Sequence, residues 1–296
     1  RRRFWIIIPL IAIAANWQYL GRIFQPPFTV GGKEANTLKI ATYNVDSFGN
    51  EQSGYSCKEI AAYMKEHRVD IICFQEFAGN RYFTPDSIRN AFADWQYAVI
   101  PQAPDSTPIL QVALFSKYPV KDSRLITYPD SRNCSMWCDL DVNGQTVRVF
   151  NSHLQTTEVS QNKRRLEREL AKNELTGREE AVAKQLLEGL NENFRKRAAQ
   201  AKTLEQLIRT TPYPILVCGD FNSLPSSYTY STVKGDNLQD GFQTCGHGYM
   251  YTFRYFKRLL RIDYIFHSKE FKGVDYYSPD LDLCSDHNPV VMEVKM

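Results

Sequence analysis

Short apolar runs that each end in polar residues recur along the chain. They span residues 40–44, 71–76, 149–154, 215–222, 261–266 and 284–291. Apolar runs of this length, bounded by polar and turn-forming residues, are typical of strands buried in a sheet. We therefore predict core strands that deliver Asn, Glu, His and Asp side chains to one end of a sheet.

Between these runs the hydrophobic period changes to that of helices. Residues 55–68 place Ile60, Ala61 and Met64 on one face, and residues 86–95 form a second predicted helix. Further strands are predicted at residues 96–101, 111–116, 124–127, 135–142 and 145–150, with an Asn-Gly hairpin turn between the last two.

A helical insert is predicted at about residues 155–210, directly after the run that contains His153. Within it, residues 179–209 repeat apolar positions in steps of three and four, which predicts a long amphipathic helix. Residues 161–172 are highly charged and predict a looser helix. Because the insert follows a polar strand end, we expect it to overhang one side of the site.

The alternation of strand pairs and helices favours an α/β fold. Strands and helices each bury one face against another layer. We therefore predict a four-layer sandwich in which two mixed β-sheets pack face to face and helices cover the outside.

Residues 1–24 form a basic and then strongly apolar start. Arg1-Arg2-Arg3 precedes an apolar stretch over residues 4–15, and residues 16–24 mix aromatic with polar positions. We favour a membrane anchor, although a span needs about 20 apolar residues and this segment reaches that length only by including polar ones. The arginines would then stay cytoplasmic, which places the following domain on the non-cytoplasmic, periplasmic side.

Two other interpretations of this start stay open. Residues 12–14 could be the cleavage site of a signal peptide, or the segment could lie on the domain or on a membrane surface. Residues 25–37 are polar and contain Gly and Pro, which predicts a linker. Residues 38–296 are expected to form one domain.

Composition distinguishes between classes of function less well than the motifs do. The 296 residues carry a net charge of only +3, so the overall charge does not indicate a nucleic-acid-binding protein. The seven cysteines include no Cys-x-x-Cys pair, which argues against a zinc site or a thioredoxin-like motif. Cys245 and Cys284 could pair in an oxidising compartment. His67, His247 and His267 match no motif and are predicted to be structural.

The candidate chemistry lies in the polar residues at the ends of the apolar runs. In chain order they are Asn44, Glu76, His153, Asp220, Asn222, Asp263, Asp286 and His287. Each of them alone is more often a packing or strand-end residue, so only the ordered set indicates an active site. Together they resemble the endonuclease/exonuclease/phosphatase superfamily, the metal-dependent phosphoesterases that include deoxyribonuclease I. The resemblance covers roughly residues 38–296 and implies the deoxyribonuclease I-like sandwich; the apolar start is similar to that of bacterial, membrane-anchored members.

The resemblance implies a divalent cation held by Asn44, Glu76 and Asp286. We expect Mg²⁺, with Mn²⁺ able to substitute, because a hard cation prefers oxygen ligands and neutralises charge on phosphoryl oxygens.

Five other residues are expected to act on water and phosphate. Either Asp220 or His287 takes a proton from the attacking water, and the sequence leaves that choice open. Asn222 holds the water or a phosphoryl oxygen, and His153 donates to a phosphoryl oxygen. Asp263 hydrogen-bonds the ring of His287 and fixes its tautomer.

Nucleic acid is the substrate that we favour from the sequence. Residues 219–230, which begin Gly-Asp-Phe-Asn, resemble the version of this motif found in deadenylase-like exonucleases. Arg258 and Arg261 are basic residues just before Asp263 in the sequence, and we expect them to bind substrate. Tyr251 belongs to an aromatic run that could stack on bases. A phospholipid of the sphingomyelinase kind and an inositol or sugar phosphate are the alternatives. A non-catalytic, membrane-tethered binding module is a further alternative.

Overall fold

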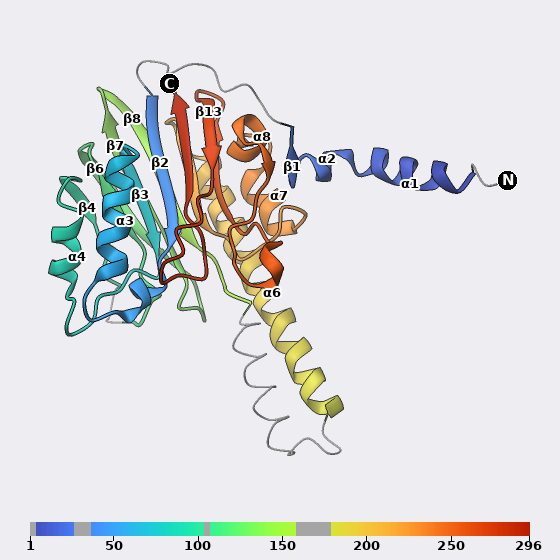
Figure 1. Cartoon of the computed structure of the whole chain (residues 1–296), viewed down its shortest axis with the longest axis horizontal. Helices are drawn as coiled ribbons and strands as arrows, with labels where there is room; N and C mark the ends of the chain where they lie inside the picture. Colours follow the sequence, from blue (N-terminus) through green and yellow to red (C-terminus); the bar gives the residue numbers. More distant parts are fainter. Residues whose placement is uncertain (1–3, 27–36, 104–106, 158–178) are drawn as a thin grey trace.

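The computed structural model describes residues 4–26, 37–103, 107–157 and 179–296 (Figure 1). Two six-stranded sheets form its centre. The first sheet has the order β13 (Lys272–Tyr277), β14 (Val290–Lys295), β2 (Thr37–Asn44), β3 (Ile71–Gln75), β5 (Ala113–Ser116) and β4 (Tyr97–Val99). The second has the order β10 (Leu238–Asp240), β12 (Asp263–Ser268), β9 (Ile215–Asp220), β8 (Gln145–His153), β7 (Cys134–Val142) and β6 (Val120–Thr127).

Both sheets are mixed in the same way. In the first sheet β2 and β3 are parallel and the other pairs are antiparallel. In the second sheet β8 and β9 are the parallel pair. Each parallel pair lies near the middle of its sheet, where both faces are buried.

Alternating side chains explain why the sheets pack face to face. In β7, Cys134, Met136 and Cys138 join the core between the sheets, whereas Trp137 points to the outer face. Because successive strand residues face opposite sides, one strand supplies two layers of core. The near-continuous apolar runs in the sequence reflect this burial on both sides.

Helices cover the two outer faces. The helices α3 (Tyr55–Glu66) and α4 (Pro85–Ala91) pack on the first sheet. The second sheet is covered by α6 (Glu179–Arg209) and α7 (Tyr228–Lys234). The short helix α8 (Gly241–Cys245) follows β10. The predicted four-layer α/β sandwich is confirmed.

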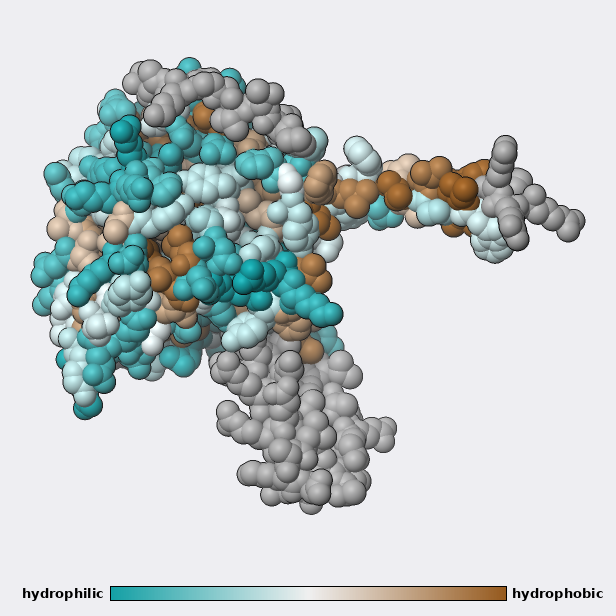
Figure 2. Space-filling model, in the orientation of Figure 1, coloured by the Kyte–Doolittle hydropathy of each residue, from teal (hydrophilic) through white to brown (hydrophobic). Residues whose placement is uncertain are grey.

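The chain before the domain forms helices α1 (Phe4–Ala15) and α2 (Trp17–Leu20). Figures 1 and 2 show α1 projecting from the domain with its apolar side chains uncovered, and Trp5 is 76% exposed. Among the helices in the described ranges, none has the length and apolar character needed to cross a membrane. The predicted anchor therefore gains no support here, and the predicted periplasmic location stays a prediction.

The strand β1 (Phe24–Gln25) pairs with β11 (Gly248–Tyr249) and so ties the N-terminal segment to the domain. Most of the predicted linker, 25–37, and the predicted helix at 161–172 lie outside the described residues. All seven cysteines are free. Cys245 belongs to the core between the sheets and Cys284 packs against the outer core under α3, so the two lie on different faces of the first sheet.

Candidate active site

The predicted site side chains leave strand ends at one edge of the sandwich. Because β2 and β3 are parallel, Asn44 and the residue after β3, Glu76, emerge at the same edge. In the second sheet β8 and β9 are also parallel, and His153 lies opposite Asp220 in register. Asp263, the first residue of β12, lies opposite Asp220 on its other side. Strand register therefore gathers Asn44 with Glu76 in one sheet, and His153, Asp220 and Asp263 in the other.

Gly219 permits the close approach of β9 to β8. Its φ is +137°, and a Cβ atom there would lie 1.9 Å from the carbonyl oxygen of Ser152. Only glycine combines that φ with the missing side chain. The glycine before Asp220 is thus required by the backbone.

Two of the predicted site residues have a left-handed backbone conformation. Glu76 has φ +50° and Asn222 has φ +48°, conformations that are uncommon for residues other than glycine. Local hydrogen bonds hold them: the Asn222 amide N–H donates to Asp220 Oδ1 (2.8 Å), and the Ser47 N–H donates to the Glu76 carbonyl (2.8 Å). Both residues line the pocket at the strand ends.

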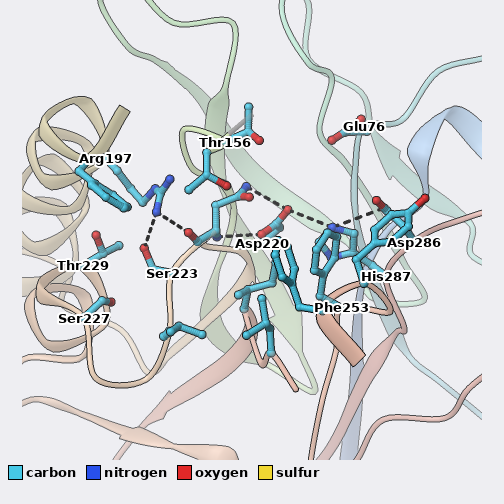
Figure 3. A pocket seen from close by; sticks show the side chains of 18 of the residues that line it. Glu76, Thr156, Arg197, Asp220, Ser223, Ser227, Thr229, Phe253, Asp286 and His287 are labelled. Carbon is cyan, nitrogen blue, oxygen red and sulfur yellow. Dashed lines mark hydrogen bonds and ion pairs between the residues drawn. The ribbon is translucent and has the colours of Figure 1, made fainter. Parts of the chain in front are cut away.

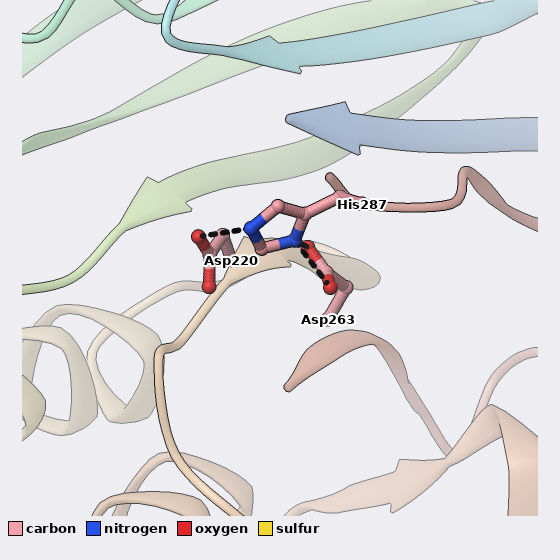
Figure 4. Close-up of side chains that lie close together, drawn as sticks. All are labelled: Asp220, Asp263 and His287. Carbon is pink, nitrogen blue, oxygen red and sulfur yellow. Dashed lines mark hydrogen bonds and ion pairs between the residues drawn. The ribbon is translucent and has the colours of Figure 1, made fainter. Parts of the chain in front are cut away.

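His287 lies between two buried carboxylates (Figure 4). Its Nδ1 is 2.9 Å from Asp263 Oδ2, and its Nε2 is 3.7 Å from Asp220 Oδ2. Burial alone would lower the pKa of His287, but the charges of Asp263 and Asp220 raise it to about 10. Burial in turn raises the pKa of Asp220. One ligand-capable atom from each of the three residues lies within 4.8 Å of the others, so this group could also hold a cation.

Asn44 connects Glu76 to Asp220. Its Nδ2 donates to Glu76 Oε1 and to Asp220 Oδ2, each at 3.1 Å. Its Oδ1 accepts from the backbone N–H of Asp46 at 3.2 Å. Asn44 therefore orients two carboxylates, and its own oxygen faces the backbone of the following turn.

His153 is buried without a hydrogen bond. Its Nε2 lies 3.6 Å from Glu76 Oε1 and 3.7 Å from Asp220 Oδ2, and neither ring nitrogen has a partner among the described residues. Burial lowers the pKa of His153 to about 4, so the ring is neutral at pH 7. A buried ring nitrogen without a partner carries a desolvation cost, which a ligand oxygen would relieve.

The strand ends open into a pocket of about 770 Å³. Figure 3 shows Glu76, Asp286 and His287 on one side of it and Arg197, Ser223 and Thr229 on the other. The carboxylate of Glu76 is 29% exposed and that of Asp286 is 36% exposed. Both are more exposed than Asp220, which also lines the pocket but is only 1% exposed.

The residues present fit a hard divalent cation. Glu76 and Asp286 supply carboxylate oxygens that line the pocket, with Asp220 beside them. Mg²⁺ is typically held by one or two carboxylates plus water and substrate phosphate, because it gives up its water reluctantly. The donor set matches that chemistry.

Two buried amides below the site were missed by the sequence interpretation. Gln75 Nε2 donates to Asn151 Oδ1 at 2.6 Å, which joins β3 to β8 across the two sheets. Asn151 Nδ2 donates to the carbonyls of Phe74 and Ala113, both at 2.9 Å. The sequence signal for them is a polar residue, Gln75 or Asn151, inside an otherwise apolar strand. These amides fix how far apart the two halves of the site lie.

Arg197 is a second residue that the sequence interpretation missed. It lies on α6 and lines the pocket. The predicted helix placed Phe194 and Ala201 on the apolar face, three residues before and four after Arg197. An arginine on an apolar face was the signal that could have identified it.

The three residues predicted to bind substrate do not line the pocket. Arg261 is buried and its Nη2 donates to Asp240 Oδ2 at 2.6 Å. Arg258 lies 3.5 Å from Asp280, and the hydroxyl of Tyr251 donates to the same carboxylate at 3.2 Å. Each of the three is instead engaged by an acid outside the pocket.

Comparison with known proteins identifies the family and supports the fold. The pattern of the endonuclease/exonuclease/phosphatase family matches residues 41–287. No curated protein matches the chain. The structure of the endonuclease/exonuclease/phosphatase from Bacteroides vulgatus is similar with a TM-score of 0.61 at 19% identity, covering 88% of this chain and 99% of that one.

Two structures of D. rerio TDP2 are also similar. A form humanized by 14 mutations gives a TM-score of 0.60 at 16% identity, covering 88% of this chain and 99% of that one. TDP2 complexed with a single-strand DNA product gives 0.60 at 15% identity with the same coverage. At these identities the likeness shows the fold. Since the family pattern spans most of the sequence, the chain belongs to the endonuclease/exonuclease/phosphatase family.

Proposed function

We propose that the protein is a Mg²⁺-dependent phosphodiesterase that cleaves single-stranded nucleic acid. Family membership makes it a metal-dependent phosphoesterase. The observation that carries the choice of substrate is the aromatic rim of the pocket. It consists of Phe194, Tyr228, Tyr255 and Phe256, whose exposed fractions lie between 45% and 55%. Exposed rings beside a cavity can stack on bases of any sequence.

Glu76 and Asp286 would hold the cation, and Asn44, which donates to Glu76, would orient that carboxylate. A bound divalent ion would neutralise charge on the phosphoryl oxygens and so lower the repulsion that an attacking hydroxide meets. Mn²⁺ offers the same oxygen-ligand preference and is expected to substitute.

The proposed proton acceptor is Asp220. His287 faces one carboxylate with each ring nitrogen, so a proton on both nitrogens is favoured. In that form it donates to a phosphoryl oxygen and cannot take a proton from water. Asp220 is the adjacent acceptor, and Asn222, which donates to it from Nδ2 at 3.1 Å, orients its carboxylate. Neutral His153 donates to a second phosphoryl oxygen.

Hydrolysis by the full chain tests this proposal. The panel comprises single-stranded DNA, RNA, duplex DNA, sphingomyelin vesicles and inositol phosphates, each with Mg²⁺, Mn²⁺ or EDTA. We expect metal-dependent cleavage of single strands that Asp286→Ala abolishes. Asp94→Ala, which removes an acid from a surface ion pair with Lys65, should keep the wild-type rate. Cleavage restricted to lipid or inositol phosphate would overturn the nucleic-acid assignment.

A phospholipid is the second candidate, and the exposed helix α1 favours it. Its uncovered apolar residues include Trp5, Ile8 and Ile11. Such a surface suits contact with the acyl boundary of a lipid layer. If vesicles are the substrate, removal of residues 1–15 should lower the rate on vesicles more than on short-chain, dispersed lipid.

A further inference from the structure

Arg197 is an arginine buried at the end of the pocket farthest from Glu76 and Asp286 in Figure 3. It is only 2% exposed. Its Nε donates to the carbonyl of Gln155 at 2.7 Å, and its Nη1 donates to Ser223 Oγ at 3.1 Å and to the carbonyl of Asn222. The side chain is therefore held in one orientation by three groups of the chain.

The remaining guanidinium nitrogen is not satisfied. Arg197 Nη2 is buried and has no hydrogen-bond partner in the part of the chain that the structure describes. Burial lowers the pKa of Arg197 to about 10, so the group stays charged at pH 7. A buried cation with an unused donor is costly, and an anion that accepts from it recovers that cost.

The surroundings of Arg197 are suited to phosphate. Hydroxyl groups line the pocket near Arg197, from Thr156, Ser223, Ser227 and Thr229 (Figure 3). Arginine and hydroxyl donors together bind phosphate oxygens, and guanidinium geometry fits them well. Apart from His287, Arg197 is the one basic residue among the described residues that line the pocket.

Hydrogen bonds through one residue connect Arg197 to the proposed catalytic centre. Asn222 accepts from Arg197 through its carbonyl and donates to Asp220 through its side chain. A strand whose scissile phosphate lies beside Asp220 and His287 would therefore carry its neighbouring phosphate toward Arg197. The exposed rings of Phe194 and Tyr228 stand at the same end, where a base would lie.

From these contacts we infer that Arg197 and the hydroxyls around it form a subsite for the phosphate next to the scissile one. The inference rests on the proposed function and adds a specificity determinant to it. Binding at this subsite favours polynucleotides over isolated phosphodiesters and fixes the register of cleavage. Arg197 also holds the loop that carries Asn222, so its test must separate binding from positioning.

Single methylphosphonate substitutions in a single-stranded DNA oligonucleotide distinguish phosphate binding by Arg197 from positioning of Asn222. Each replaces one anionic phosphate by a neutral group of similar shape. In the wild-type protein, substitution of the phosphate adjacent to the cleaved bond should lower kcat/KM by about 10- to 100-fold, the range expected for hydrogen bonds to a charged group. Substitutions farther along the strand should have smaller effects.

Arg197→Gln should remove this discrimination whatever its overall rate. The variant is expected to cleave native and adjacent-substituted strands at rates within about twofold, because the partner of that charge is gone. Arg209→Gln, at the exposed end of the same helix, should keep the wild-type ratio. If Arg197→Gln only misplaced Asn222, both strands would slow equally and the wild-type ratio would persist, which would overturn the inference.

The wild-type scan decides the question even if Arg197→Gln fails to fold. Efficient cleavage with no sensitive position other than the scissile phosphate would overturn the subsite and leave the nucleic-acid function intact. Thr229→Val, which removes one hydroxyl at the same end, should reduce the ratio in part. Absence of cleavage of every nucleic acid, with turnover of another phosphoester, would overturn the proposed function and the subsite together.

Discussion

Buried histidines in this protein differ in whether a carboxylate hydrogen-bonds the ring. His287 donates to Asp263 and its pKa is raised to about 10, whereas the pKa of His153, which has no such bond, is lowered to about 4 by burial. His267 lies between neutral groups: its Nε2 is 3.1 Å from the hydroxyl of Thr244 and its Nδ1 is 3.0 Å from the carbonyl of Ser268. Burial lowers the pKa of His267 as well.

His267→Gln should reduce the loss of folding stability that occurs as the pH falls from 7.5 to 5. A histidine whose folded pKa lies below its unfolded value near 6.5 stabilises the fold above that pH and loses the contribution as pH falls. Between pH 7.5 and pH 5, the free energy of unfolding by urea should fall less in the variant than in wild type. His247→Gln, at an exposed position, should match the wild-type slope. Equal slopes in all three proteins would contradict the neutral state of His267.

Glu76→Gln tests the proposed metal ligand. The amide removes one anionic oxygen from the pocket while keeping the shape of the side chain. We expect the Mg²⁺ concentration for half-maximal activity to rise by about tenfold or more, because a hard cation binds a carboxylate far better than an amide. Glu66→Gln, on the surface end of α3, serves as control. An unchanged Mg²⁺ titration would remove Glu76 from the ligand set.

The positions of the residues at strand ends could be predicted from the sequence, whereas the partners of the arginines that we expected to bind substrate could not. Asn44, Glu76 and Asp220 each follow an apolar run, and strand register then brings them together. Arg261 follows a similar local pattern, yet its direction is set by Asp240 and by the carbonyl of Arg22, far away in the sequence. Partners of that kind leave no local signal.

At the scale of elements, two parallel strand pairs place the site. The carboxyl ends of β2 and β3 in one sheet face those of β8 and β9 in the other, so one edge of the sandwich collects four polar strand ends. Antiparallel neighbours alone would distribute strand ends over both edges. The close spacing of β8 and β9 depends on Gly219.

Gly219→Ala should destabilise the fold by roughly 3 kcal/mol or more, because the added methyl group meets a backbone carbonyl on a φ that alanine rarely adopts. Chemical denaturation measures this. Gly189→Ala is the matched control, since it lies within α6 with nothing within 4 Å of the new atom. That substitution should stabilise by up to about 1 kcal/mol. A Gly219→Ala protein as stable as wild type would refute the close approach.

Element boundaries were predicted well where periodicity was strong. The helix α6 spans the residues predicted, and β7 and β8 begin within one residue of their predicted starts. The aromatic run at 249–256 does not continue as a strand beyond β11. Phe256, Lys257 and Arg258 all have φ between +52° and +59°, which extended backbone excludes. Side-chain alternation does not reveal such left-handed turns.

At the scale of the whole molecule, the N-terminal segment is joined to the domain near the pocket. Arg22 donates from Nη1 to the carbonyl of Pro225 at 2.9 Å, and its guanidinium lies 5.0 Å from the ring centroid of Tyr230 on α7. Its carbonyl accepts from Arg261 at 2.9 Å. The sequence suggested a domain beginning at residue 38, because these partners lie some 200 residues away.

Arg22→Ala should lower the stability of the domain by about 1–3 kcal/mol through loss of the hydrogen bond and the contact with the ring. Thermal unfolding measures the change. Arg209→Ala removes an exposed arginine that pairs with Glu205 in its own helix, and should change stability by less than about 0.5 kcal/mol. Equal melting temperatures for Arg22→Ala and Arg209→Ala would show that the segment does not stabilise the domain.

Metal-dependent hydrolysis of a chromogenic phosphodiester tests the proposed active site most directly. The proteins compared are the full chain, its His287→Asn variant and a His67→Asn control. His67 lies at the end of α3 outside the pocket. With Mg²⁺ we predict activity of the full chain that EDTA abolishes. The His287→Asn substitution should lower this activity by about 10²- to 10⁴-fold, and the His67→Asn control should retain it. Turnover that persists in EDTA, or that His287→Asn leaves at the wild-type rate, would contradict the assignment of this pocket as a phosphoesterase active site.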